Sequence, residues 1–147
     1  MNMLNLRRRA LLLLVLTGLC AAQTPLPLAV MRYTNSGLDL KTAAATVLCT
    51  TRSTPPRFHP MEVIFEVTSA DTVTTVPTCA LGTSPTYSDV LAATPLTGLT
   101  ASNTLLRVPI VTAVSSPLTA TDLYVNVTVG ATATTCTGKV ILLGYYE

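Results

Sequence analysis

The stretch DLYVNVTVGATATTCTGKVILLGYYE, residues 122–147, decides the expected fold. Every second residue from Leu123 to Val129 is apolar, which predicts a strand with one buried and one wet face. Gly130 ends this strand, and a second strand is expected from about Thr135 to Tyr145. This second strand contains a nearly continuous apolar run, which is typical of strands buried on both faces. We therefore expect both strands to lie in the interior of a sheet.

Upstream segments show the same strand character between turns rich in Pro, Gly, Ser and Thr. Strands are expected at 29–33, 46–51, 61–69, 76–82 and 103–114. Pro109 places the last of these at a sheet edge or a bulge. No convincing long helix interrupts them, so the fold class predicted is all-β, an antiparallel β-sandwich, jelly-roll-like, of about seven or eight strands.

Two places depart from a simple strand pattern. Ile64 is an apolar residue on the otherwise polar face of the 61–69 strand, which would be explained if that face were partly covered. Residues 84–99 are expected to form a long connection, in which Ser88-Asp89 could cap one helical turn before Pro95 stops it.

The first 22 residues have the layout of a secretory signal peptide, with a basic start, a short apolar run and small residues before Gln23. The apolar run from Ala10 to Ala22 forms the short hydrophobic N-terminal helix that we expect before the sandwich. At roughly 20 Å it is short for a bilayer core of about 30 Å. An N-terminal anchor and a misassigned start, with the protein beginning at Met31, are the alternatives. The expected organisation is 1–22 leader, 23–37 linker and first strand, and 38–147 β-sandwich domain.

Charge is scarce, since only 11% of residues are charged. Removal of the three leader arginines leaves six basic against seven acidic residues, so no basic patch for nucleic acid or anionic lipid is expected. Threonine is abundant in place of charged residues, with 26 among the 125 residues from Gln23 onward. Low charge means weak solvation, which favours a surface partly covered by another protein.

Three cysteines, Cys49, Cys79 and Cys136, follow the leader. In an exported protein, two of them could form a disulfide and leave one free thiol, or one could form a bridge to another chain, and the spacing does not choose among the three possible pairs. The alternative is three small buried side chains within strands. A zinc site is not expected, because no C-x-x-C pair or Cys/His cluster is present.

Catalytic chemistry has few candidates. The single histidine, His59, sits in a proline-rich turn without an acid or cysteine at a useful spacing, so we expect no catalytic residue. Glu62 and Glu66 are expected to be about 13 Å apart on one strand face, too far for a glycosidase pair. The loop carboxylates (Asp71, Asp89, Asp122) lack a calcium-loop pattern, and N-V-T at 126–128 fits a glycosylation sequon in mid-strand. No metal, no cofactor, no small-molecule substrate and no enzymatic activity are therefore expected.

Several phrases, taken in order, resemble small β-sandwich virion proteins of phages, of the head-decoration, head-fibre or spike kind. These phrases are LKTAAATVLCTT, FHPMEVIFEVTSAD, PTCALGTSPTYSDVL, LTGL and DLYVNVTVGATATTCTGKVILLGYY. They span Leu38 to Tyr146. The resemblance implies a non-enzymatic structural module that sits on a particle surface, binds a major capsid or other virion protein, and self-associates, often as a trimer. The signal-like leader departs from this pattern.

Two functions follow. The first is a virion surface protein, and the alternative is a secreted bacterial binding or matrix module or filament subunit, which explains the leader directly. In both, the candidate sites are contacts formed by tyrosines, which join apolar area to a polar tip. The candidates are Tyr87, Tyr124, Tyr145 and Tyr146.

Overall fold

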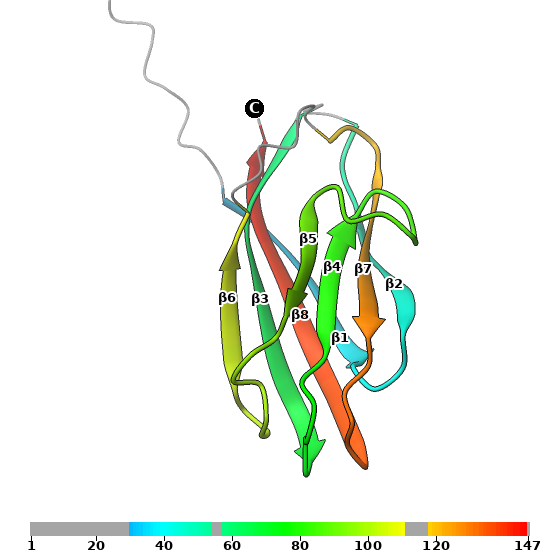
Figure 1. The fold of residues 1–147 in the computed structure, drawn as a ribbon. Coiled ribbons are helices and arrows are strands. Elements are labelled where there is room, and N and C mark those ends of the chain that lie inside the picture. The colour runs from blue at the N-terminus through cyan, green and yellow to red at the C-terminus, as the bar shows by residue number, and fades with distance from the viewer. Residues whose placement is uncertain (1–29, 54–56, 111–117, 147) are drawn as a thin grey trace, which may run out of the picture.

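The computed structural model describes residues 30–53, 57–110 and 118–146, which form eight strands (Figure 1). The strands are β1 (Val30–Asp39), β2 (Ala44–Thr50), β3 (Phe58–Asp71), β4 (Thr78–Gly82), β5 (Leu91–Pro95), β6 (Leu105–Pro109), β7 (Asp122–Val129) and β8 (Thr135–Tyr146). The expected leader, the apolar N-terminal helix and the linker up to residue 29 lie outside the described residues.

The strands form two four-stranded sheets that face each other (Figure 1). Sheet A has the order β1-β8-β3-β6, and sheet B has the order β2-β7-β4-β5. All paired strands are antiparallel. The expected all-β class with two antiparallel sheets is confirmed, and the described part of the chain contains no helix.

The core lies between the sheets and is built by the alternation that the sequence shows. In β3, Val63, Phe65 and Val67 are fully buried, while the intervening side chains point outward. In β7, the alternation holds from Leu123 to Val127 but fails at Val129, which is 52% exposed. The buried face of β7 therefore ends at Val127, one inward-facing residue earlier than expected.

The predicted positions of the two C-terminal strands are confirmed, since β7 and β8 are both interior strands of their sheets. They belong to different sheets, so the Thr/Ala/Gly stretch between them crosses from sheet B to sheet A. Pro109 ends β6, which among the described strands pairs only with β3 and lies at the edge of sheet A. An edge suits proline, because it has no N–H donor for a second neighbouring strand.

Other boundaries were wrong. The expected connection at 84–99 contains β5, which pairs with β4. No helical turn follows Ser88-Asp89, because the Asp89 carboxylate instead accepts hydrogen bonds from Thr83. β1 is longer than the 29–33 segment. β3 begins at Phe58, inside the expected turn, and tolerates its proline where a bulge shifts the register beyond residue 60.

Among the described residues, no helix is long and apolar enough to cross a membrane.

Candidate interaction surfaces

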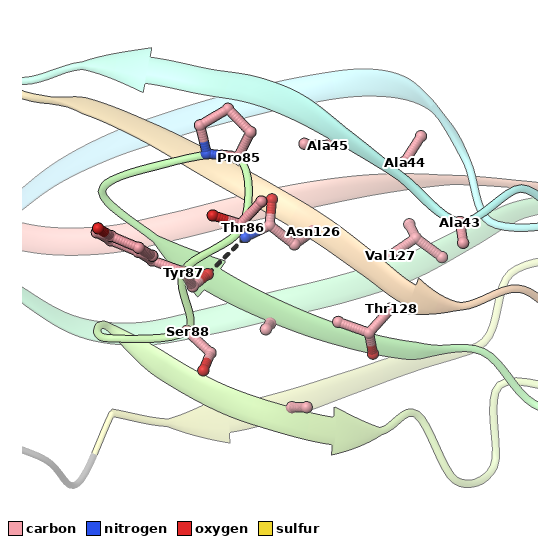
Figure 2. Close-up of a pocket in the computed structure, with 12 residues that line it drawn as sticks. Ala43, Ala44, Ala45, Pro85, Thr86, Tyr87, Ser88, Asn126, Val127 and Thr128 are labelled. Carbon is pink, nitrogen blue, oxygen red and sulfur yellow. Dashed lines mark hydrogen bonds between the residues drawn. The ribbon is translucent and has the colours of Figure 1, made fainter.

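The loop between β4 and β5 folds back over the outer face of sheet B. Gly82 makes this possible, because a Cβ at this position would overlap the carbonyl of Tyr87. The Asn126 side chain on β7 fixes the loop from below, with its Nδ2 donating to the Tyr87 carbonyl at 2.5 Å (Figure 2). Asp89 closes the loop by accepting bonds from the Thr83 N–H at 2.9 Å and its hydroxyl at 2.7 Å.

The folded loop forms one wall of a groove of about 440 Å³ on sheet B. Small side chains form much of the remaining lining, namely Ala43, Ala44, Ala45, Ala80 and Ala93. Asn126 is 5% exposed, and its Oδ1 has no hydrogen-bond partner in the part of the chain that the structure describes. No charged residue lines the groove. Its chemistry therefore suits contact with a small apolar or amide-bearing segment.

The four candidate tyrosines divide between the two sheets. Tyr87 is 57% exposed, and its ring points away from the alanines of the groove (Figure 2). Tyr124 is half-buried on the outer face of β7. Tyr145 is half-buried at the end of β8 and stacks on His59 with ring centroids 4.9 Å apart. The structure does not gather these side chains into one patch, and their role as contacts stays a prediction.

Tyr146 contacts three residues of the folded chain. Its ring lies 5.1 Å from that of Phe58, its hydroxyl is 2.7 Å from the Tyr33 hydroxyl, and the same hydroxyl accepts a bond from the Arg52 N–H. Burial, together with this hydroxyl pair, raises the pKa of Tyr33 above its usual range. The pair thus ties the C-terminal end of β8 to β1.

The outer face of sheet A carries an apolar patch that the sequence analysis did not assemble. Ile64, Ile141, Leu143 and Leu105 come from three strands and line a hollow of about 350 Å³. Two signals pointed to it: Ile64 broke the polar face of its strand, and β8 was apolar on both faces. The strand register brings these signals together, since Ile64 and Ile141 are paired across β3 and β8.

The three described cysteines are free thiols. Cys79 on β4 and Cys136 on β8 are buried in the core from opposite sheets, and Cys49 on β2 is half-buried. Burial raises the pKa of Cys49 and of Cys79 to about 12, and it also raises the pKa of Cys136. A disulfide between two of these cysteines stays a prediction.

The buried thiols should react slowly with thiol reagents in the folded protein, and their ionisation should lower the stability of the fold at alkaline pH. Because thiolates are the reactive form, the native protein should react slowly with Ellman's reagent near about pH 8 and rapidly once unfolded. The thiols of Cys49 and Cys79 have a pKa near 9 in the unfolded chain and of about 12 in the folded chain, so their stabilising contribution is complete below pH 9 and is lost as pH rises toward 12. Immediate reaction of all three native thiols, or stability unchanged across this interval, would contradict the buried placement.

Five carboxylates form ion pairs or hydrogen bonds with other residues of the folded chain. Glu62 lies 3.2 Å from Arg107, and Glu66 lies 2.5 Å from Lys139. The loop carboxylates accept bonds from threonine hydroxyls: Asp71 from Thr72, Asp89 from Thr83 and Asp122 from Thr50. Within the described ranges, no group of three His, Cys, Asp or Glu side chains could hold a metal ion. Asn126, the sequon asparagine, is buried with its amide engaged by the loop, so the folded chain does not offer it for glycosylation.

Geometry therefore defines the chain as a two-sheet, all-β protein with an alanine-lined groove on the outer face of sheet B and an apolar hollow on the outer face of sheet A. Among solved structures, a chain from "Capsid of Ralstonia phage GP4" matches with a TM-score of 0.54 and 19% identity, covering 85% of this chain and 91% of that chain. A chain from "Cyanophage Pam1 capsid asymmetric unit" matches with a TM-score of 0.54 and 17% identity, covering 86% and 94%. No family model and no curated protein matches the sequence. At these identities, the likeness establishes the fold alone.

Proposed function

We propose that this chain is a non-enzymatic structural protein of a phage virion, located on the particle surface as a decoration, fibre or spike component. The observation that carries the proposal is that both similar structures come from phage capsids and share nearly the whole fold. The low charge, the apolar patch on sheet A and the alanine groove on sheet B support a protein that acts by contact. In this proposal, its partners are further copies of itself, as in a trimer, and a major capsid or other virion protein.

We also infer that the sandwich is a jelly roll. The sheet orders β1-β8-β3-β6 and β2-β7-β4-β5 support this assignment, because in both sheets strands distant in sequence lie side by side. Every connection except that from β4 to β5 crosses between the sheets. Jelly rolls of eight strands in two sheets occur in viral capsid domains, which agrees with the proposed role.

A secreted bacterial binding or matrix module, or a filament subunit, is the second candidate. The signal-like layout of residues 1–22 favours it, since virion proteins that assemble in the cytoplasm need no export signal. N-terminal sequencing separates the possibilities: a start at Gln23 favours export, an intact Met1 favours an anchor, and a start at Met31 favours a misassigned first codon. An oxidised pair among Cys49, Cys79 and Cys136 in the isolated protein would also favour export.

Immunogold electron microscopy of intact particles tests the surface location. Antibodies raised against the folded chain should label the outside of purified particles without disruption. Antibodies against an internal virion protein provide the matched control and should label only opened particles. Label confined to opened particles would contradict the surface location, and label on extracellular filaments or matrix would favour the second candidate.

A further inference from the structure

The outer face of sheet A has an aliphatic centre with charges around it. We define this face by the side chains that point away from the core on its four strands. They are Arg32 and Thr34 on β1, Lys139, Ile141 and Leu143 on β8, Glu62, Ile64 and Glu66 on β3, and Leu105 and Arg107 on β6. Leu105 is 60% exposed, Ile64 and Leu143 are half-buried, and Ile141 is only 7% exposed. Seven of the ten residues line the shallow hollow. An apolar surface rimmed by charges is typical of a protein–protein contact.

The charges on this face follow a regular arrangement. Glu66 pairs with Lys139 across β3 and β8, and Glu62 pairs with Arg107 across β3 and β6. Arg32 forms no ion pair with a described residue. The strand register sets these positions in rows: Ile64 lies opposite Ile141, Glu66 opposite Lys139, and Glu62 opposite Leu143.

From this register we infer that the face binds the same face of a second copy about a two-fold axis. The inference rests on the self-association in the proposed function and specifies pairs of copies about a two-fold axis in place of a trimer. The axis would run along the strands, midway between β8 and β3. A half turn about it exchanges these two strands between the copies, because they are neighbours in the sheet. A two-fold contact of this kind must be complementary to itself.

This operation matches the face to itself in chemistry as well as shape. Ile141 of one copy lies over Ile64 of the second copy, and Lys139 lies over the second copy's Glu66. β1 of one copy lies over β6 of the second copy, so Arg32 comes beside the second copy's Glu62. Each Lys139–Glu66 pair thus becomes part of a four-charge group, and Arg32 gains an acidic neighbour. The face keeps a net charge of about +1 per copy, because Arg32, Lys139 and Arg107 outnumber Glu62 and Glu66.

The size of the face sets the expected strength. The half turn lays β8 over β3 and β1 over β6, so the 12 residues of β8 and the five of β6 limit the overlap. At about 3.3 Å per residue and about 4.8 Å between strands, the overlap is roughly 500 Å² per copy. Standard stable interfaces bury about 800 Å² per partner, so we expect association in the micromolar range. Measurements should therefore cover about 1 to 100 μM.

Charge reversal in trans gives the decisive experiment. Glu66→Lys gives a chain with lysine at both positions, and Lys139→Glu gives a chain with glutamate at both, so each variant repels its own copies. We expect each full-length variant alone to associate at least tenfold more weakly than the wild-type chain. Mixed in equal amounts, the two variants should recover association as a heterodimer, measured by light scattering and by native mass spectrometry. The intrachain pair is lost in both variants, so only a contact between copies explains recovery on mixing.

Val129→Glu is the control, because it places a charge at an exposed apolar position on sheet B and should leave association unchanged. Circular dichroism and thermal melting establish that each variant is folded. Single variants that associate like the wild-type chain would overturn this surface while leaving self-association through another face intact. A mixture that stays monomeric would also overturn it. A monomeric wild-type chain would overturn both the surface and self-association, whereas the virion location would still be decided by immunogold labelling.

Discussion

Phe58→Ala should destabilise the fold by about 3–5 kcal/mol, the usual cost of removing a buried phenylalanine ring. Phe58 is fully buried at the start of β3. Its ring packs edge-on to Tyr33 at 5.4 Å and against Tyr146 at 5.1 Å, beneath their hydroxyl pair. Truncation would leave a cavity that the two tyrosines cannot fill without breaking that pair. Urea unfolding followed by circular dichroism measures the loss.

Met61→Ala is the matched control for this substitution. Met61 lies on the same strand but is 50% exposed, so its removal should change the free energy of unfolding by no more than about 0.5 kcal/mol. Equal effects of the two substitutions would mean that Phe58 does not close the core. The account of how β1, β3 and β8 are joined would then be wrong.

Gly82→Ala should be the second severe substitution, with an expected loss of about 1–3 kcal/mol from overpacking. The new Cβ would overlap the backbone carbonyl of Tyr87, and backbone cannot swing aside as a flexible side chain can. Either the loop lifts from sheet B, which breaks the bond to Asn126, or β4 shifts in the sheet. Thermal melting should report the loss, and hydrogen exchange should report faster exchange in residues 83–89.

Ser88→Ala is the control in the same loop, because its side chain is exposed and should be dispensable. If Gly82→Ala left both the melting temperature and exchange in the loop unchanged, the loop would not pack on sheet B as described. The groove of Figure 2 would then lose one of its walls.

The fold class could be predicted because its main signal is local. Alternation in β3 and β7 follows directly from the period of a strand, and the apolar run of β8 reflects an interior strand. Pro109 indicated an edge because it lacks an amide donor. These features depend on residues a few positions apart, which a sequence displays openly.

The missed features depend on pairing between distant segments. β5 contains Ala92 and Ala93, which have weak strand preference, and it is a strand because β4 offers an open edge. Asp89 resembled a helix cap, but its carboxylate accepts hydrogen bonds from Thr83 on the other side of the loop. Competition of this kind, in which tertiary contacts override a local preference, leaves little trace in the sequence.

The candidate surfaces depend on features that residue type alone does not show. Tyrosines were chosen by residue type, and the structure places half-buried Tyr146 against Phe58 and Tyr33 and does not gather the four into one patch, so their role as contacts stays a prediction. The apolar patch on sheet A was indicated by Ile64, but its other members became neighbours only through the register of β3, β6 and β8. The groove on sheet B depends on a loop that folds back, for which Gly82 and Asn126 gave no readable signal.

Quantitative mass spectrometry of purified particles tests the central claim most directly. Particles would be purified by density gradient from a culture whose phage or host genome encodes this chain. The amount of the chain would then be measured relative to the major capsid protein. The account predicts a fixed ratio to the capsid protein that persists through repeated purification. Absence of the chain from particles, with recovery of the folded protein in the particle-free medium, would contradict the virion role.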